Sequence, residues 1–418
     1  MAAVNERQDP RRWVVLGVGL LGLTAGCAAQ YGLAFLIPAL RAEGYNLEAA
    51  TLVVTAPIAG ILCTLIAWGA AADRFGERRI LTLGLAIAGA AGLGAASLHD
   101  PLQRWLMLFV VGASSSSIHA ASGRLILGWF GAQERGLAMG IRQMGQPLGV
   151  GLAAIVLPSL AVAGTGDALA ALGVACLASA ALIWVVVRDP VRTAPTNGAA
   201  PVSPYREAFL WRVHAASGLL VIPQFAVTVF AFDYLVNALG WSITGAGGLL
   251  AATQLAGAGS RLLVGWWSDR AGSRLGPMRL VALVIGLSMG ALASLAWVGA
   301  SVAVAALAVA AIVTVTSNGL AFTAVAERAG PRWAGRALGV QNTFQNVVAA
   351  LVATPLALLI GAAGGGAPGY ALAFGAVVVF PFVAAALIPV RAEALEESVS
   401  ASENARSRET GPRAGPAG

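Results

Sequence analysis

Long apolar runs dominate this chain and limit what it can fold into. Twelve stretches have about the 20 apolar residues that an α-helix needs to cross a membrane. They span 13–37, 49–72, 80–98, 104–127, 137–163, 168–187, 209–236, 244–267, 279–297, 301–325, 337–361 and 369–389. The chain has 11% charged residues, whereas a soluble domain has about 25%. The sequence therefore predicts an all-α membrane protein with twelve transmembrane helices.

The few charged residues indicate how the chain is oriented in the membrane. All 26 basic residues are arginine, and most lie in short loops between apolar runs. With the N-terminus in the cytoplasm, 21 arginines are cytoplasmic, two (Arg41 and Arg104) are outside, and three (Arg124, Arg142 and Arg261) lie within helices. Because cytoplasmic loops are enriched in basic residues, we expect both termini in the cytoplasm and the protein in the inner (plasma) membrane.

Other functional classes find little support in the composition. The net charge of +7 reflects loop arginines and not a patch for nucleic acid. The three cysteines lie in separate apolar runs, so no disulfide framework or metal motif is expected. The first apolar run is too long for a cleavable signal peptide and has no cleavage site. We expect no cofactor, no metal and no nucleic acid, and we expect a monomer.

A polar stretch divides the apolar runs into six and six. Residues 188–208 are rich in Pro, Ala, Thr and Ser and are expected to form a cytoplasmic linker. On this division, residues 1–12 are a cytoplasmic N-terminus, 13–187 an N-terminal six-helix bundle and 209–389 a C-terminal six-helix bundle. The polar, Gly/Pro/Ser-rich tail, 390–418, is expected to be disordered and cytoplasmic.

The two halves repeat each other. Residues 69–78 and 265–274 both follow the pattern G-x-x-x-D-R-x-G-x-R, 196 positions apart. A weaker echo relates 140–143 (Gly-Ile-Arg-Gln) to 339–342 (Gly-Val-Gln-Asn), 199 positions apart. Near-equal offsets indicate duplicated six-helix units. Parallel repeats of this kind place a binding site near the membrane midplane, between the halves.

These two loops resemble the signature of the major facilitator superfamily, and the resemblance covers about residues 13–389. It implies two pseudo-symmetric bundles that rock around a central site, without catalysis. The chain is thus expected to be a secondary active transporter that works by alternating access. It is expected to be surrounded by membrane lipids. It is not expected to be an enzyme.

The same resemblance assigns a gate to the repeated loops. Carboxylates are favoured near helix N-termini, where unpaired backbone N–H groups concentrate. The family pattern implies that Asp73 lies near residues 334–340 and Asp269 near residues 135–142, latching the cytoplasmic side. The alternative is that these charges only set topology. The residues expected to form the gate are Asp73, Arg74, Gly76, Arg78, Arg124, Glu134, Asp269, Arg270, Gly272 and Arg274. Arg124 is expected to pair with Asp73 or Glu134.

Arg261 is the main candidate for contact with a substrate. It precedes Asp269 by eight residues, or about 12 Å of helix. The stretch 261–269 is similar to the eighth helix of oxalate/formate antiporters and monocarboxylate transporters, where an arginine at this spacing binds the substrate carboxylate. No Asp or Glu lies within this helix, so a substrate anion is the simplest expected partner, and carbonyls of a neighbouring helix are the alternative. Arg142 is expected to be a second anion ligand or part of the gate.

Further polar positions complete the predicted site. The residues expected to bind substrate are Arg261, Arg142, Tyr31, Gln30, His119, Gln224, Asn318, Gln341 and Gln345. Taken alone, each of Gln30, Tyr31, His119, Gln224 and Asn318 more often makes an interhelical hydrogen bond than binds a ligand. Oxalate transporters have a lysine in the eleventh helix, where this chain has glutamines and asparagines, which favours a monoanion or a polar neutral group. His119 is also a candidate proton carrier, the alternative being a packed, hydrogen-bonded histidine.

The sequence leaves three functions open. The first is transport of a small organic anion such as a monocarboxylate, coupled to protons or exchanging. The second is proton-driven export of hydrophobic drug-like compounds, because residues 140–151 partly resemble the Gly/Pro motif of drug antiporters; close helix packing is the alternative for that motif. The third is a membrane sensor that does not transport. An anion carrier predicts Arg142 or Arg261 at a small polar site, whereas a drug exporter predicts a large aromatic-lined cavity.

Overall fold

The computed structural model describes residues 9–162, 164–190, 203–299 and 302–393. These residues form helices joined by short connections, and no strand occurs among them. The predicted all-α class is therefore confirmed. Most of the predicted N-terminus, linker and C-terminal tail lies outside the described residues. The prediction that the tail is disordered therefore concerns residues that the structure does not describe.

The N-terminal half contains the first six predicted segments, several of them interrupted. Its helices are α2 (Arg11–Tyr31), η1 (Gly32–Leu36), α3 (Ile37–Ala42), α4 (Leu47–Phe75), α5 (Glu77–Ala96), α6 (Pro101–Ser115), α7 (Ser117–Trp129), α8 (Arg135–Gln143), α9 (Gly145–Leu160) and α10 (Thr165–Val186). The fourth segment breaks at Ser116 and the fifth at Met144. Both breaks lie inside apolar runs.

The C-terminal half follows the same plan. Its helices are η2 (Pro204–Arg206), α11 (Ala208–Asp233), η3 (Tyr234–Ala238), α12 (Ile243–Ala271), α13 (Leu275–Trp297), α14 (Ala303–Val313), α15 (Asn318–Ala362), α16 (Ala367–Ala376) and α17 (Val379–Leu387). Helix α15 joins the end of the tenth predicted segment to the eleventh through a sharp bend at Gly330, whose φ of 68° suits glycine. The tenth segment is broken between α14 and α15, about 199 residues after the break in the fourth.

Nine helices in the described part of the chain are long and apolar enough to cross a membrane. The difference from the predicted twelve has two causes. The tenth and eleventh segments run together across Gly330 and form one span. The fifth and eighth segments are not among the nine: α8 and α9 are short, and α12 is interrupted by polar and charged side chains. These two segments carry Arg142 and Arg261.

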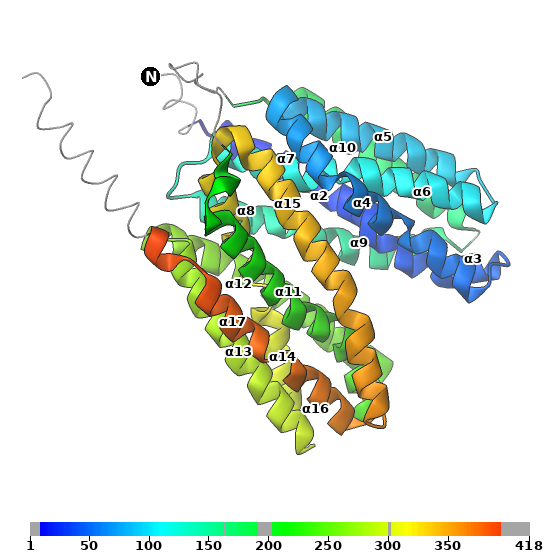
Figure 1. Ribbon diagram of the computed structural model, residues 1–418. Helices are drawn as coiled ribbons and strands as arrows, with labels where there is room; N and C mark the ends of the chain where they lie inside the picture. Colours follow the sequence, from blue (N-terminus) through cyan, green and yellow to red (C-terminus); the bar gives the residue numbers. More distant parts are fainter. Residues whose placement is uncertain (1–8, 163, 191–202, 300–301, 394–418) are drawn as a thin grey trace, which may run out of the picture.

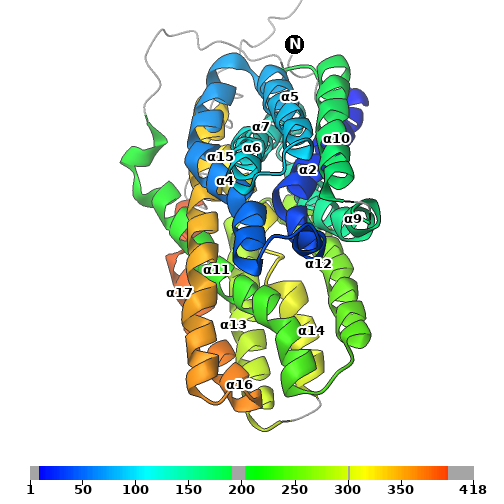
Figure 2. The same cartoon turned by 90° about the vertical axis from the view of Figure 1, so that its right-hand side faces the viewer.

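The helices form two groups that meet at one end. Helices α2–α10 pack mainly with one another, as do α11–α17, and the two groups touch mainly through α4, α7 and α8 on one side and α12 and α15 on the other. In Figure 1 the groups meet near α7 and α8 and diverge toward α3 and α16. Figure 2 shows α15 running alongside both. We call the end with loops 69–78 and 265–274 the arginine-rich end.

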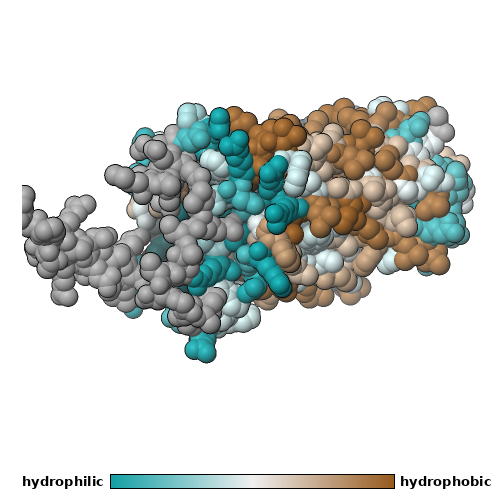
Figure 3. All heavy atoms as spheres, turned by 90° about the horizontal axis from the view of Figure 1, so that it is seen from above, coloured by the Kyte–Doolittle hydropathy of each residue, from teal (hydrophilic) through white to brown (hydrophobic). Residues whose placement is uncertain are grey.

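The outer surface suits a lipid environment. Large apolar side chains are exposed around the molecule, among them Leu52, Ile155, Leu263 and Leu351. Figure 3 shows a broad apolar band between polar ends. Since soluble monomers rarely expose so large a contiguous apolar surface, this band marks the part of the protein that faces lipid.

A buried clasp closes the N-terminal group at the end opposite the arginine-rich end. Arg104 is 1% exposed and donates to Glu43 Oε2 at 2.9 Å and to the carbonyl of Leu98. Thr165 donates to Glu43 through its backbone N–H and its hydroxyl. Burial alone would raise the pKa of the Glu43 carboxyl, but these hydrogen bonds and the Arg104 charge outweigh it and lower the pKa.

We expect Glu43→Gln to destabilise the protein by about 1–3 kcal/mol, because it leaves the buried Arg104 without its counter-charge. The pKa of Glu43 is lower in the folded protein, so its contribution is complete above the ordinary carboxyl pKa and is lost as pH falls through the lowered value. Thermal unfolding in detergent, followed from neutral to acidic pH, measures both effects. A melting temperature unchanged by Glu43→Gln would contradict the clasp.

Candidate functional site

Each repeated loop places an aspartate on a helix of the other group. Asp73 accepts hydrogen bonds from the backbone N–H groups of Gly335 (2.8 Å) and Arg336 (3.0 Å). Asp269 accepts from the N–H groups of Gly136 and Leu137, both at 2.8 Å. Gly136 and Leu137 lie in the first turn of α8, and Gly335 lies five residues after the bend at Gly330. All four donors fall within the residue ranges expected from the sequence.

Arg124 supports the first of these contacts. Its guanidinium lies 2.9 Å from Asp73 Oδ1 and 2.7 Å from Glu77 Oε1. It also donates to the carbonyl of Pro331 at 2.8 Å, across to the C-terminal group. Arg124 and Asp73 are both nearly inaccessible to solvent, so the pair is protected from screening.

Arg274 supports the contact of Asp269 with α8 in the way that Arg124 supports that of Asp73. It donates to Asp269 Oδ1 at 2.6 Å and to Glu327, and it reaches the carbonyl of Ala132 in the N-terminal group. Burial alone would lower the pKa of the Arg274 guanidinium, but the carboxylates of Glu327 and Asp269 raise it, so this arginine stays charged. Ala132 and Pro331 are 199 positions apart, so the two arginines bind equivalent carbonyls.

Glycine lets the two groups touch backbone to backbone beside each aspartate. A Cβ atom added at Gly69 would lie 2.2 Å from the carbonyl oxygen of Gly335, and one at Gly265 would lie 2.3 Å from that of Gly136. Both distances are far inside van der Waals contact, so a larger residue cannot fit without separating the helices. We had not predicted these four glycines as gate residues, although Gly69 and Gly265 occupy the first position of the repeated pattern.

Other predicted gate residues do not bridge the groups. Of the two partners expected for Arg124, the structure has Asp73 and not Glu134: Glu134 pairs with Arg12 at 2.9 Å, while the Arg124 guanidinium is engaged by Asp73, Glu77 and backbone carbonyls. Gly76 and Gly272 have positive φ angles, 90° and 66°, as tight turns require.

Three predicted arginines instead lie over aromatic rings of their own group. Arg74 lies over Phe75, Arg78 over Trp184 and Arg270 over Trp266, with 5.2, 4.2 and 3.9 Å between guanidinium carbon and ring centroid. These positions suit residues that fix the loop at the surface. They leave the cross-group contacts to the aspartates, Arg124 and Arg274.

Nearer the centre, Arg261 ties the two groups together. Its Nε donates to the carbonyl of Val315 at 3.1 Å, and its Nη1 donates to the carbonyl of Gln143 at 2.6 Å. Gln143 ends α8, and Val315 lies in the break between α14 and α15. Carbonyls at such helix ends have no intrahelical partner. The simplest expectation, that a substrate anion is the partner of Arg261, is therefore wrong for these two nitrogens, because the helix breaks supply acceptors.

Arg261 is still not fully saturated. The side chain is 8% exposed, and no hydrogen bond within the described residues uses its Nη2. One edge of the fork therefore has no hydrogen-bond acceptor within the described chain. This free edge is the feature that a planar anion could use.

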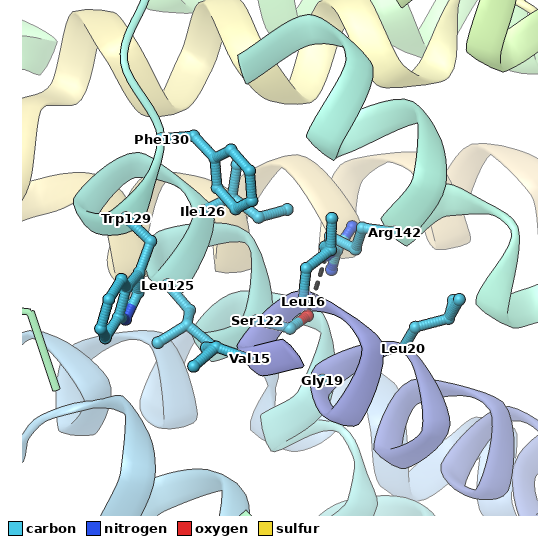
Figure 4. Close-up of a pocket in the computed structure, with 10 residues that line it drawn as sticks. All are labelled: Val15, Leu16, Gly19, Leu20, Ser122, Leu125, Ile126, Trp129, Phe130 and Arg142. Carbon is cyan, nitrogen blue, oxygen red and sulfur yellow. Dashed lines mark hydrogen bonds between the residues drawn. The ribbon is translucent and has the colours of Figure 1, made fainter. Parts of the chain in front are cut away.

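Arg142 donates its hydrogen bonds within the N-terminal group, and its guanidinium carbon lies 5.6 Å from the ring centroid of Phe322 on α15. Its Nε donates to Ser122 Oγ at 2.8 Å, its Nη1 to Gln143 Oε1 at 2.6 Å and its Nη2 to the carbonyl of His119 at 2.5 Å. Figure 4 shows it at the edge of a small apolar pocket between α2 and α7, which has room for about one water molecule. Each guanidinium nitrogen has a partner, so Arg142 is not free to bind a ligand in this conformation.

The two arginines flank one residue. Gln143 accepts from Arg142 through its side chain and from Arg261 through its backbone. No carboxylate of the described chain pairs with either guanidinium. Two positive charges therefore lie at the break in the fifth segment, balanced only by neutral oxygens. Burying charge without a counter-charge is costly, so this centre favours an added anion.

The remaining predicted ligands form two hydrogen-bonded clusters. In the N-terminal group, Gln30 donates to Ser115 Oγ at 2.8 Å, and its Oε1 lies 2.9 Å from His119 Nε2; Tyr31 is half-buried beside it. His119 is thus hydrogen-bonded and packed, as the alternative expectation held.

The second cluster lies in the C-terminal group. Asn318 donates to Gln224 at 3.1 Å, and Gln345 lies 3.4 Å from Asn318. Gln341 and Gln345 both donate to Ser217, at 2.5 and 2.6 Å. The sequence reasoning missed Ser217 and its neighbour His214, although both fall on one face of the seventh helix. Among the predicted ligands, only Arg261 bonds across to the N-terminal group.

Glycines near Arg142 serve packing. A Cβ atom at Gly149 would lie 2.4 Å from the carbonyl oxygen of Thr24, and one at Gly145 would lie 2.7 Å from the side chain of Leu23. This close approach to α2 gives the stretch 140–151 a structural explanation. The resemblance to a drug-antiporter motif is not needed to account for it.

Known proteins of one kind resemble this chain over most of its length. A model of the Major Facilitator Superfamily matches residues 19–354. An uncharacterized MFS-type transporter of Mycobacterium tuberculosis (strain H37Rv) is 40% identical over 385 residues, which cover 91% of this chain and 85% of that protein. The glycerol-3-phosphate transporter of Bacillus subtilis (strain 168) is 24% identical over 287 residues, 60% of this chain and 64% of that protein.

Solved structures agree on the fold. The human organic anion transporter MFSD10 (TETRAN) superposes with a TM-score of 0.73 at 16% identity, covering 90% of this chain and 100% of that chain. FucP of E. coli, in its outward conformation, superposes with a TM-score of 0.68 at 15% identity, covering 90% of this chain and 99% of that chain. At such low identity these likenesses concern the fold alone.

Proposed function

This chain belongs to the major facilitator superfamily, and on that premise we propose that it is a secondary active transporter of small organic anions. One observation carries the proposal: the buried Arg142 and Arg261 meet at Gln143, and no carboxylate of the described chain pairs with either. Two guanidinium groups without a counter-charge favour an anion over a neutral or cationic substrate. The similarity to a transporter named for glycerol-3-phosphate supports the same class.

The contacts between the two groups suggest how binding drives alternating access. We take the arginine-rich end as cytoplasmic, because loop arginines concentrate there. The structure then corresponds to a state closed toward the cytoplasm, with the site approached from outside. Opening the cytoplasmic end breaks the bond from Arg261 to the Gln143 carbonyl, which crosses between the groups. A bound anion would replace that acceptor, so the substrate lowers the cost of opening.

Counterflow in proteoliposomes tests this function. Vesicles of purified protein loaded with an unlabelled compound are diluted into the radiolabelled form, with lactate, glycerol-3-phosphate and tetraphenylphosphonium as probes. We expect carboxylate or phosphate anions to be exchanged above the level of protein-free vesicles. Exchange of tetraphenylphosphonium and of neither anion would overturn the proposal and favour export of hydrophobic compounds.

A further inference from the structure

A chain of hydrogen bonds leads from the described end of the linker into the C-terminal group. The hydroxyl of Tyr205, in η2, lies 3.1 Å from His214 Nε2. His214 Nδ1 contacts Gln341 Oε1, and Gln341 Nε2 donates to Ser217 Oγ at 2.5 Å. Gln345 Nε2 also donates to Ser217 Oγ and lies 3.4 Å from Asn318 Oδ1, so the series of hydrogen bonds extends to Asn318. His214 therefore lies between the linker and two glutamines, Gln341 and Gln345, that the sequence predicts to bind substrate.

The network assigns the protons on this histidine. Because the Gln341 amide nitrogen donates to Ser217, its oxygen is the acceptor that faces His214. His214 Nδ1 therefore carries a hydrogen, and Nε2 accepts from the Tyr205 hydroxyl. Burial raises the pKa of Tyr205, so this hydroxyl keeps its proton. Nε2 is then the one basic atom in the chain of contacts.

The charged groups around His214 are engaged elsewhere. Arg212, on the same helix, donates to the carbonyl of Leu387 on α17. Glu207 pairs with Arg328. On α15, Arg336 lies over the ring of Trp333, 4.6 Å from its centroid, and pairs with Asp73.

His119, the other membrane-embedded histidine, differs from His214 in having a charged side chain beside it. The Arg142 guanidinium binds its carbonyl, so a positive charge already lies beside that residue. His214 makes its hydrogen bonds only to uncharged groups, so no charged side chain contacts a proton added there.

We propose that His214 is a proton-binding site of this transporter, with Tyr205 as the group that adapts to its charge. The proton adds to Nε2, the imidazole becomes a cation that donates through both nitrogens, and the Tyr205 hydroxyl turns from donor to acceptor. Gln341 keeps its hydrogen bond from Nδ1. The added positive charge lies beside Gln341, one of the residues predicted to bind substrate, so proton binding and anion binding are expected to support each other. The coupling, though not the proton site itself, rests on the proposed function.

Proton-driven accumulation tests the coupling. Proteoliposomes with an alkaline interior are compared for lactate accumulation and for lactate counterflow. We expect His214→Gln to lose accumulation driven by the pH gradient and to retain counterflow. Tyr205→Phe is expected to shift the pH dependence of accumulation, and His99→Gln, in the loop at the opposite end, serves as the unaffected control. Gradient-driven accumulation in His214→Gln at the wild-type level would overturn the proposal.

A second measurement separates this proposal from the proposed function. The chain has three histidines, so selective isotope labelling gives few imidazole NMR signals, and His214→Gln identifies the one that belongs to His214. We expect that signal to titrate between about pH 5 and 8 in lipid nanodiscs, and to shift in Tyr205→Phe. A His214 signal that does not titrate would overturn the proton site, even if lactate is not a substrate.

Discussion

Replacing Gly335 with leucine is expected to abolish transport while leaving a folded protein. A Cβ atom at this position would lie 2.3 Å from the carbonyl oxygen of Gly69 and 2.7 Å from Asp73 Oδ1. The obstacle is backbone, which cannot rotate away, so α4 and α15 must separate. The hydrogen bonds that Asp73 accepts from Gly335 and Arg336 would then be lost. The protein would stay open at the arginine-rich end and could not complete a cycle.

Accessibility of a single cysteine would show that opening. Leu338, on α15, is buried against Gly123 of α7. In a background with Cys27, Cys63 and Cys176 replaced by serine, Leu338→Cys should react slowly with a membrane-impermeant maleimide supplied from the cytoplasmic side. Adding Gly335→Leu should make the reaction fast.

Gly361→Leu is the matched control for this prediction. It changes a glycine near the other end of the same helix, where an added Cβ atom would meet nothing within 4 Å. It should transport like the wild type and leave Leu338→Cys protected. Wild-type counterflow by Gly335→Leu would refute the proposed gate.

Arg261→Gln is expected to lower the efficiency of anion transport by at least about 30-fold, the factor that corresponds to about 2 kcal/mol. Glutamine can still donate a hydrogen bond to a carbonyl, but it lacks the charge and the free edge of the guanidinium. Arg261→Lys keeps the charge and loses the fork, so its transport should be intermediate. Counterflow rates over a range of substrate concentrations measure both variants, with the exposed Arg41→Gln as control.

The same variants distinguish a binding role from a structural one. If Arg261 serves only to join the breaks at Gln143 and Val315, its removal should lower the melting temperature along with transport. If it is kept for an anion, removing an uncompensated buried charge should leave the melting temperature unchanged or raise it. A large loss of stability in Arg261→Gln with anion transport intact would contradict the anion site.

The architecture could be predicted because its signals are local and repeated. The apolar runs indicate membrane helices wherever they are long enough. The repeated loops, 196 positions apart, indicate duplicated halves, and their resemblance to the major facilitator signature implies where Asp73 and Asp269 should dock. The all-α fold and the family are confirmed on this basis.

The centre could not be predicted in the same way. The breaks beside Gln143 and Val315 lie inside apolar runs, where length and composition alone do not show them. The Gln143 carbonyl lacks a helical donor because Pro147, four residues later, has no N–H. Because the breaks were not predicted, a substrate anion was the simplest expected partner of Arg261, and the carbonyls that it binds were only the alternative. The sequence could not decide between Asp73 and Glu134 as the partner of Arg124, since the partner of Glu134, Arg12, lies 122 residues away. His214 was overlooked because its partners come from the linker and the eleventh segment.

Ligand-induced stabilisation tests most directly whether the centre binds an anion. A compound that binds the folded protein raises its melting temperature by mass action, whether or not it is transported. Purified wild type and Arg261→Gln would be melted with small monocarboxylates, lactate among them, and with the corresponding neutral amides, such as lactamide. We predict that at least one acid stabilises the wild type, that its amide does not, and that Arg261→Gln loses the difference. Equal stabilisation by acid and amide, or the same response in Arg261→Gln, would contradict the account.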